Sequence, residues 1–224
     1  MHIIFSINTC NKGQQVKIDC ISDTHGLVKL SDLKWSDDAD MLIIAGDFTR
    51  NTKAGSVYAI LEEIAELQHK YKVVIAGNHD GLFSVFQPDW KSLGITYLEN
   101  NIVEIEGLRI AGSPYTPKFC NWWFMKSESE LFDMWDELLD NNIDILITHG
   151  PPLGILDKNA RGEHCGSTAL KRIVEKYKPR YHVMGHIHES SGSYHNDYTK
   201  FYNVSVLNGD YELENPITTI EVNR

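Results

Sequence analysis

The sequence has no apolar run long enough to cross a membrane, no internal repeat, no low-complexity stretch and no linker rich in Pro, Gly or Ser. A membrane helix needs roughly 18 or more consecutive apolar residues, so we expect no membrane partner. The N-terminal stretch also lacks the basic region and the apolar length of a secretory signal. With 224 residues and no linker, the chain is expected to form one domain, 1–224.

Cysteine is scarce and shows no paired pattern. The chain has four cysteines, none of them in a C-x-x-C arrangement: Cys10, Cys20, Cys120 and Cys165. This pattern argues against a disulfide framework and against a structural zinc site of the Cys type. Free thiols are typical of a reducing compartment, so we expect a cytoplasmic protein.

Positive charge is also in short supply. The chain has 31 acidic residues against 21 Lys and Arg, which gives a formal net charge of −10. Because a nucleic-acid backbone is bound through basic surface, we expect no stable binding to nucleic acid. An acidic protein that acts on phosphates would need another source of positive charge, and a metal site is the obvious candidate.

The chain does contain short apolar runs that alternate with amphipathic segments. The runs at 16–21, 41–45, 72–76, 143–148 and 181–185 each predict a buried strand. Helices are predicted over 57–67, from a capping box at Ser127 and Glu130 through 138–139, and over 168–177. The segment 201–222 is predicted to be rich in strands, with a turn at Asn208-Gly209. This alternation indicates an α/β layered fold with further strands at the edges or in a second sheet.

Polar residues stand directly after five of the predicted strands. They are Asp23 and His25; Asp47; Asn78, His79 and Asp80; His149; and His186 and His188. Ligands of α/β proteins bind beyond the carboxyl ends of the strands, so one sheet edge would gather these side chains. Each piece alone has an ordinary explanation, since Asp and Asn favour turns and helix caps. Their combination, each at a strand end, predicts one functional site.

The residue types in this group favour a metal site. Carboxylates, an amide and imidazoles without thiolates suit Mn, Fe or Zn. A carboxylate can bridge two cations, and two such metals about 3.5–4 Å apart clamp a phosphate and lower the pKa of a water between them. The resulting hydroxide can attack phosphorus at neutral pH.

These residues resemble the motif set of the calcineurin-like metallophosphoesterases. The resemblance covers about residues 16–205 and is carried by Asp23-x-His25, Gly46-Asp47, Gly77-Asn-His79, His149 and Gly185-His-x-His188. Within that superfamily, Gly46-Asp-Phe-Thr49, Thr148-His-Gly-Pro-Pro-Leu-Gly154 and Tyr202-Asn-Val-Ser205 are similar to the metallophosphoesterase-domain (MPPED) subfamily of phosphodiesterases. The resemblance implies a four-layer αββα sandwich in which two mixed β-sheets are flanked by helices.

The resemblance also implies roles for individual residues. One divalent metal would be held by Asp23, His25, Asp47 and His188, and the other by Asp47, Asn78, His149 and His186, with Asp47 as the bridge. Mn is favoured, and Fe, Zn, Ni or Co are compatible. His79 would stand near the phosphate and stabilise the transition state or protonate the leaving oxygen. Asp80, where the subfamily commonly has Glu, would orient the His79 ring. Some animal members have Gly in place of His186, so the His here implies a complete binuclear centre.

Other residues are candidates for binding the substrate. Asn78, Arg50 and Arg161 could hold a phosphate, the two arginines bidentately. Four further side chains could wall a nucleobase pocket by stacking or could simply pack in the core: Tyr115, Asn121, Trp122 and Trp123. The remaining histidines match no motif and are expected at the surface or in the core: His2, His69, His164 and His195.

The function indicated first is a metal-dependent phosphodiesterase that acts on a small phosphoester such as a nucleotide or cyclic nucleotide. A phosphomonoesterase acting on a small molecule or a protein remains an alternative, because the same two-metal core serves both reactions. A protein Ser/Thr phosphatase ranks lower, since Phe48-Thr-Arg-Asn51 stands where that family has Val-Asp-Arg-Gly-like residues. A non-catalytic metal-binding interaction scaffold is the third alternative, because a fold alone does not guarantee catalysis.

Overall fold

The computed structural model describes residues 6–7, 15–50 and 54–224. His2 and Cys10, for which the sequence predicts a surface or core histidine and a free thiol, lie outside the described residues. Within the described part of the chain, no helix has the length and apolar character that a membrane crossing requires.

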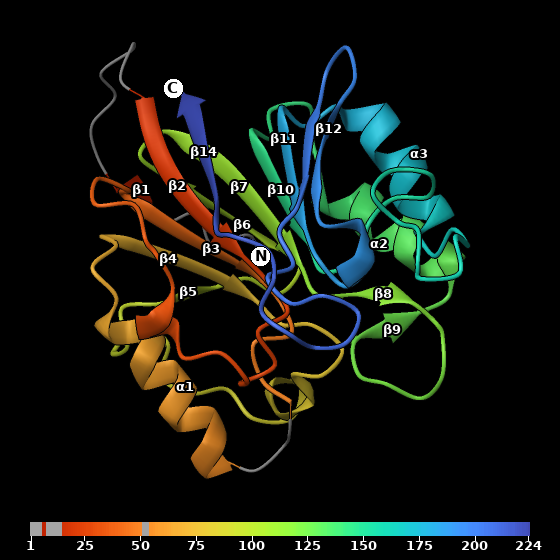
Figure 1. Ribbon diagram of the computed structural model, residues 1–224. Helices are drawn as coiled ribbons and strands as arrows, with labels where there is room; N and C mark the ends of the chain where they lie inside the picture. Colours follow the sequence, from red (N-terminus) through yellow and green to blue (C-terminus); the bar gives the residue numbers. More distant parts are fainter. Residues whose placement is uncertain (1–5, 8–14, 51–53) are drawn as a thin grey trace.

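The strands form two main sheets (Figure 1). One has the order β14-β2-β3-β4-β5 and is parallel apart from β14, which runs antiparallel to β2. Its strands are β2 (Gln15–Ile21), β3 (Met41–Ala45), β4 (Tyr71–Ile75), β5 (Thr96–Tyr97) and β14 (Thr218–Asn223).

The second sheet has the order β1-β6-β7-β10-β11-β13-β12, with antiparallel pairing in β6–β7 and β12–β13 only. Its strands are β1 (Ser6–Ile7), β6 (Asn101–Ile105), β7 (Leu108–Ser113), β10 (Ile145–Thr148), β11 (Tyr181–Met184), β12 (Gly192–His195) and β13 (Lys200–Asn203). Two short strands, β8 (Thr116–Pro117) and β9 (Met125–Lys126), pair separately beside it.

Helices cover the outer faces of the two sheets (Figure 1). The helix α1 (Ala54–Glu66) covers the five-stranded sheet, and α2 (Glu128–Leu138) and α3 (Thr168–Tyr177) cover the seven-stranded sheet. Short 3₁₀ helices occur at Leu30–Asp32, Gly81–Ser84 and His188–Ser190. The predicted capping box is confirmed, since the Glu130 amide donates to Ser127 Oγ and the Ser127 amide donates to the Glu130 carboxylate.

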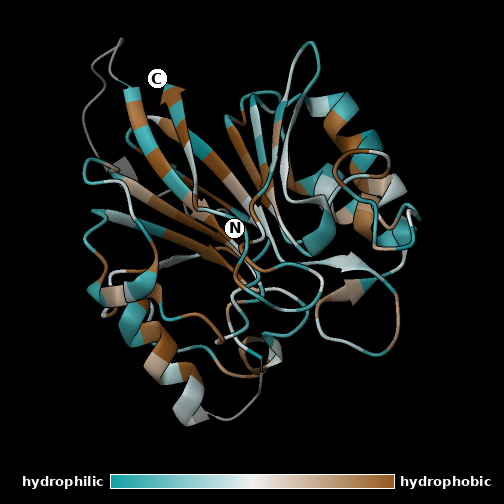
Figure 2. Cartoon of the chain, in the orientation of Figure 1, coloured by the Kyte–Doolittle hydropathy of each residue, from teal (hydrophilic) through white to brown (hydrophobic). Residues whose placement is uncertain are grey.

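The alternation of side chains along each strand produces the layers. Along β3, Met41, Ile43 and Ala45 pack between the two sheets, whereas Leu42 and Ile44 pack against α1. A third apolar cluster fills the space between the seven-stranded sheet and α2 and α3. The predicted four-layer αββα sandwich is therefore confirmed, and Figure 2 shows strands that are largely hydrophobic beneath more hydrophilic connections.

Two of the predicted elements differ from the structure. The strand expected over 143–148 begins only at Ile145, because Ile143 packs in the helix-side cluster instead of pairing. The strand-rich prediction for 201–222 is wrong over 204–217, where there are only isolated bridges and the predicted turn after Asn208. This segment is held instead by contacts to the loops that follow the strands, such as the hydrogen bond from the His188 ring to the Asn208 carbonyl.

Candidate metal centre

The carboxyl ends of the parallel strands from both sheets meet at one edge of the sandwich. The sheets are joined there, since the Ser22 amide after β2 donates to the Val204 carbonyl after β13 at 2.9 Å, and Ser22 and Ser205 form a parallel bridge. This junction brings together the side chains that the sequence predicts as metal ligands, although they come from five strands spread along 166 positions of the chain, from 23 to 188.

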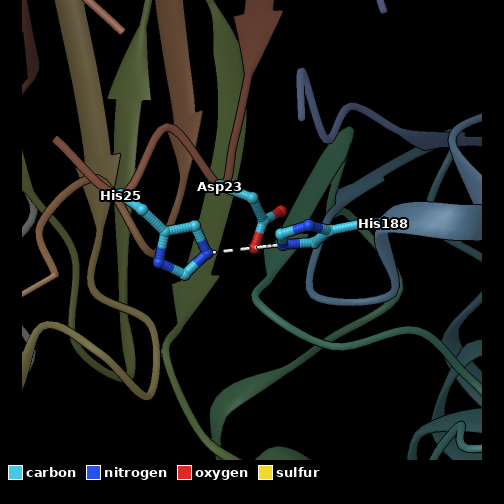
Figure 3. Close-up of side chains that lie close together, drawn as sticks. All are labelled: Asp23, His25 and His188. Atoms are coloured by element: carbon cyan, nitrogen blue, oxygen red, sulfur yellow. Dashed lines mark hydrogen bonds and ion pairs between the residues drawn. The ribbon is translucent and has the colours of Figure 1, made fainter. Parts of the chain in front are cut away.

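Three overlapping groups of side chains have ligand atoms within 4.8 Å of one another, and one of them, His25, Asp47 and His79, shares members with the other two. The first of these two clusters is Asp23, His25 and His188. Figure 3 shows the Asp23 carboxylate between the two imidazole rings. The Nε2 atoms of His25 and His188 are 3.3 Å apart, and His188 Nε2 is 3.4 Å from Asp23 Oδ1. Asp23 Oδ1 has no hydrogen-bond partner although it is buried.

Asp47, His149 and His186 form the second cluster, again within 4.8 Å. His149 Nε2 lies 3.2 Å from Asp47 Oδ2 and 3.1 Å from Asn78 Oδ1. Asp47 Oδ2 is also 3.9 Å from His25 Nε2 of the first cluster. The two clusters are therefore contiguous, and Asp47 stands at their junction.

The tautomers of two histidines are fixed by backbone carbonyls. His149 Nδ1 donates to the Ala45 carbonyl at 2.9 Å, and His188 Nδ1 donates to the Asn208 carbonyl at 3.0 Å. In the neutral rings the Nε2 lone pair of His149 then faces Asp47 Oδ2, and that of His188 faces Asp23 Oδ1 and His25 Nε2. Lone pairs that converge in a buried space need a cation, so this donor set fits divalent metal ions of the Mn, Fe or Zn kind.

Each central carboxylate is held through one oxygen, which leaves the other oxygen for the cluster. Asp23 Oδ2 accepts from Ser22 Oγ at 2.6 Å, Ser205 Oγ at 2.7 Å and the His186 amide at 2.9 Å. Asp47 Oδ1 accepts from the His79 amide at 2.7 Å. Fixing the ligands from behind in this way orients them toward a metal and limits their freedom before it binds.

The backbone at the site adopts strained conformations. Four predicted ligands have left-handed φ angles: Asp23 (57°), His25 (48°), Asp47 (51°) and His186 (72°). Such conformations cost roughly 1–3 kcal/mol each in non-glycine residues and concentrate at functional sites. Gly77 is required for a different reason, because a Cβ there would lie 2.3 Å from Asp47 Oδ1.

Without a metal, the nearby carboxylates and burial shift the pKa values of the ligand histidines in opposite directions. Burial alone would lower the pKa of His149, but the Asp47 charge outweighs it and raises that pKa to about 9. Burial likewise would lower the pKa of His188, but the Asp23 carboxylate, whose Oδ1 lies 3.4 Å from His188 Nε2, outweighs it and raises that pKa. Burial lowers the pKa of His25 to about 4 and that of His186 to about 3. The Asp47 and Asp23 carboxylates thus favour the protonated form of the two rings that lie against them, where a cation would also compensate their charge.

His79 and Asp80 do not form the predicted pair. The His79 ring lies at the site, 4.7 Å from the His25 ring between centroids, and burial lowers its pKa. The Asp80 carboxylate is buried and accepts from the Thr49 amide, the Thr49 hydroxyl and the Gly77 amide. The prediction that Asp80 orients the His79 ring is therefore wrong. Asp80 instead ties together the loops that follow β3 and β4.

A pocket of about 610 Å³ opens over the two clusters. Asn78 and Arg161 line it, whereas Arg50 does not. The Arg50 guanidinium lies over the ring of Tyr211, a lining residue, at 4.9 Å. Arg161 is paired with Glu163 at 3.0 Å. Of the four predicted wall residues only Trp122 lines the pocket, and Tyr115, Asn121 and Trp123 do not.

The structure adds residues that the sequence did not single out. Ser22 and Ser205 hold Asp23, Tyr211 packs against the rings of His25 and His188, and Phe119 lies against His186. Ser22 directly precedes Asp23, and this adjacency is the one feature of the sequence that could have pointed to its role. The contacts of the other three join segments far apart in the chain and leave no local pattern.

The histidines outside the motifs have ordinary roles. His69 is buried and bonded to Asp19 at 3.1 Å, His164 bonds the buried Asp157 at 2.7 Å, and His195 is exposed on β12. Cys20, Cys120 and Cys165 are free thiols, as the sequence predicts.

Comparison with known sequences finds a consistent similarity. The family model of the calcineurin-like phosphoesterases matches residues 16–190. A UPF0046 protein of Caenorhabditis elegans is 33% identical over 93% of this chain and 60% of its own length. The human metallophosphoesterase domain-containing protein 1 is 34% identical over 91% of this chain and 70% of its own length. The chain thus spans between 60% and 70% of the length of these relatives.

Solved structures resemble the fold. One crystal structure has a TM-score of 0.66 at 17% identity and covers 85% of this chain and 90% of its own. The crystal structure of TT1561 of Thermus thermophilus has a TM-score of 0.58 at 13% identity and covers 85% of this chain and 89% of its own. These likenesses concern the arrangement of sheets and helices.

Proposed function

This chain belongs to the calcineurin-like phosphoesterase family, and we propose that it is a metal-dependent phosphoester hydrolase, more specifically a phosphodiesterase with a two-metal centre. Its substrate would be a small phosphodiester of the nucleotide or cyclic nucleotide type. The chain spans only part of its relatives, so the activity is proposed for the domain itself.

One observation carries the proposal, namely the contiguity of two ligand clusters at Asp47. Asp47 Oδ2 faces His149 of one cluster at 3.2 Å and His25 of the other at 3.9 Å. A carboxylate oxygen placed between two sets of imidazoles is suited to bridge two cations. We assign Asp23, His25, Asp47 and His188 to one ion, and Asp47, Asn78, His149 and His186 to the other. Mn is the favoured metal.

When bound, two such ions supply positive charge to the phosphate oxygens and lower the pKa of a water between them. The chain supplies the geometry. Asp23 and Asp47 are locked by Ser22, Ser205 and the His79 amide, so the ligands need no rearrangement before binding. The loop after β4 positions both Asn78 and His79.

His79 is the residue that we assign to proton transfer. Its ring lines the pocket and is partly exposed, whereas the ligand histidines His25 and His149 are buried. Its ring nitrogens form no hydrogen bond with another described side chain, so they are free to meet a substrate. A positioned imidazole can donate a proton to the leaving oxygen and contributes roughly 10²–10⁴-fold.

The pocket volume of about 610 Å³ suits a small ligand. Its lining carries Lys118 and Arg161, so cationic side chains accompany the metal site in an otherwise acidic chain. Free thiols at Cys20, Cys120 and Cys165 support a cytoplasmic location.

Hydrolysis of bis(p-nitrophenyl) phosphate and p-nitrophenyl phosphate, with added Mn and with chelator, tests the proposal. We expect chelator-sensitive diester cleavage that clearly exceeds monoester cleavage and that is lost in His79→Ala and Asp47→Ala. A preference for the monoester would make the protein a phosphomonoesterase. If two bound ions gave no turnover of either ester, the protein would be a metal-binding scaffold.

A further inference from the structure

The pocket over the metal centre is larger than a phosphate requires. Members of both ligand clusters line it, and its lining also includes three aromatic side chains: Phe119, Trp122 and Tyr211. A phosphate bound at the clusters would leave these rings free to contact the rest of a substrate. The rings are therefore placed to influence the substrate specificity of the site.

Phe119 and Trp122 belong to one loop whose base is fixed. The loop connects β8 and β9, which pair in parallel, and the Thr116 amide donates to the Phe124 carbonyl at 2.9 Å. The Lys118 amide donates to the Lys126 carbonyl at 3.0 Å. The two aromatic rings are thus carried on a loop that is anchored at both ends.

The loop reaches over both ligand clusters. The Trp122 ring lies 4.3 Å from the His79 ring, which in turn packs against His25 of the first cluster. The Phe119 ring lies 5.2 Å from the His186 ring of the second cluster. Each aromatic ring thus rests against a site histidine while 41% of Phe119 and 45% of Trp122 stay exposed.

Trp122 differs from the well-packed tryptophans of the chain. Trp35, Trp90 and Trp135 each donate the indole N–H, to the Leu30 carbonyl, the Gln87 side chain and Ser113 Oγ respectively. Among the described residues, neither Trp122 nor Trp123 has such an acceptor, and of these two only Trp122 lines the pocket. An indole beside the reactive site with much of its surface open is suited to stacking on a planar ligand group.

We propose that Trp122 and Phe119 are specificity-determining residues that bind a planar ring of the phosphoester substrate. The inference rests on the proposed function, because it places the scissile phosphate at the metal centre. Since His79 is assigned to the leaving oxygen, Trp122 lies on the leaving-group side and Phe119 lies over the second cluster. The ring is chemically an aryl group or a nucleobase, and both would use the same stacking surface.

Binding of matched ligand pairs tests this inference apart from turnover. Calorimetric titrations in the presence of Mn would compare phenylphosphonate with methylphosphonate, and adenosine 5′-monophosphate with ribose 5-phosphate. Stacking of one ring predicts that the ring-bearing ligand binds about fivefold to a hundredfold more tightly. The phosphonate pair measures the preference for an aryl ring. If the affinity ratio is larger for adenosine 5′-monophosphate over ribose 5-phosphate, the surface is a nucleobase site.

Variants of the loop separate ring contact from loop integrity. The measured quantity is the ratio of the affinities for the ring-bearing and the ring-free ligand. Trp122→Ala should reduce this ratio at least about fivefold, and Phe119→Ala should also reduce it. Trp122→Phe should retain most of it. Trp123→Ala is the matched control, because Trp123 is a neighbour in the same loop with 44% exposure but does not line the pocket. It should keep the wild-type ratio.

Three results would overturn the inference: equal affinities of the wild type for ring-bearing and ring-free ligands, no binding of either ring-bearing probe, or an equal loss in Trp123→Ala and Trp122→Ala. The inference and the proposed function fail separately. A ring preference without any chelator-sensitive diester cleavage would remove the proposed function and keep the stacking surface. Diester cleavage with no ring preference would keep the proposed function and remove the stacking surface.

Discussion

Two buried assemblies of Asp and His can be compared within the described residues, and one of the two is suited to a metal. At Asp19, the carboxylate accepts from the His69 ring at 3.1 Å, from the Ser36 amide and hydroxyl at 2.9 Å each, and from Thr219 Oγ1 at 2.7 Å. At the sheet edge, Asp23 Oδ1 has no partner, and the Nε2 atoms of His25 and His188 face each other at 3.3 Å.

The difference between these assemblies lies in how their lone pairs are satisfied. The Asp19 carboxylate is saturated by donors from the protein, so the Asp19–His69 pair contributes to stability and leaves nothing for an ion. The Asp23 and Asp47 carboxylates have one oxygen held and one oxygen directed at imidazoles whose tautomers are fixed. Burial of Asp and His is thus common to both assemblies, and unmet lone pairs identify the metal centre.

The largest effect is expected when the same substitution is made in both assemblies. Asp47→Asn should lower kcat/KM for bis(p-nitrophenyl) phosphate by at least about a hundredfold, because Asp47 stands at the junction of the clusters. Asp19→Asn, which also neutralises a buried carboxylate, should leave kcat/KM near the wild-type value. Steady-state kinetics with saturating Mn measures both, and equal losses would contradict the distinction.

The second prediction concerns stability. His69→Ala should lower the free energy of unfolding by about 3 kcal/mol, since it leaves the buried Asp19 charge without its ring partner. His25→Ala in the metal-free protein should cost less, because His25 Nε2 is 3.9 Å from Asp47 Oδ2, beyond hydrogen-bond distance, so its loss removes no hydrogen bond from that carboxylate. Urea denaturation in chelator compares the two variants. A greater loss for His25→Ala would show that the metal centre is the better-satisfied assembly.

The third prediction concerns the loss of stability at low pH. Burial would raise the pKa of Asp19, but hydrogen bonds from His69, Thr219 and Ser36 outweigh it and lower that pKa to about 2. A folded pKa below the unfolded value means that the stabilisation is present above about pH 4 and is lost as pH falls toward 2. Between pH 5 and 2 the wild type should therefore lose about 2 kcal/mol more stability than Asp19→Asn.

Urea midpoints measured at each pH test this difference. The carboxylates of the metal centre are common to both proteins, so their titration cancels in the comparison. Parallel pH profiles for the wild type and Asp19→Asn would argue against a strongly stabilised Asp19 carboxylate.

The smallest predicted effects come from one hydroxyl in each assembly. Ser205→Ala removes a donor to Asp23 Oδ2 and should weaken Mn binding about 10- to 100-fold. Ser36→Ala removes a donor to Asp19 Oδ1 and should cost about 1 kcal/mol of stability while leaving Mn affinity unchanged. Calorimetric Mn titrations and urea denaturation of both variants give the four values. Weaker Mn binding in Ser36→Ala would link the two assemblies and contradict their separation.

Most of the buried strands and the helices can be predicted from the sequence. The sheet edge at which the polar residues lie can be predicted as well. Apolar runs such as 41–45 predict buried strands, and the direction of parallel strands then places Asp47 and His149 at the same edge. The periodicity of 57–67 likewise predicts α1, whose apolar face packs on the five-stranded sheet.

Long-range contacts explain what the sequence could not predict. Ser205 meets Asp23 across 182 positions, and His69 meets Asp19 across 50, with no local pattern to mark either contact. Adjacency in sequence also misled, because Asp80 follows His79 but turns its carboxylate to Thr49 and Gly77. The left-handed backbone at Asp23, His25, Asp47 and His186 is imposed by the assembled site on residues that do not favour it.

The number of metal ions bound per chain tests the central claim most directly. Protein loaded with Mn, freed of excess metal and analysed by plasma mass spectrometry should contain two ions per chain, and Asp47→Asn should contain fewer while Asp19→Asn keeps two. One ion or none in the wild type, or an equal loss in both variants, would contradict a two-metal centre formed where the carboxyl ends of the two sheets meet.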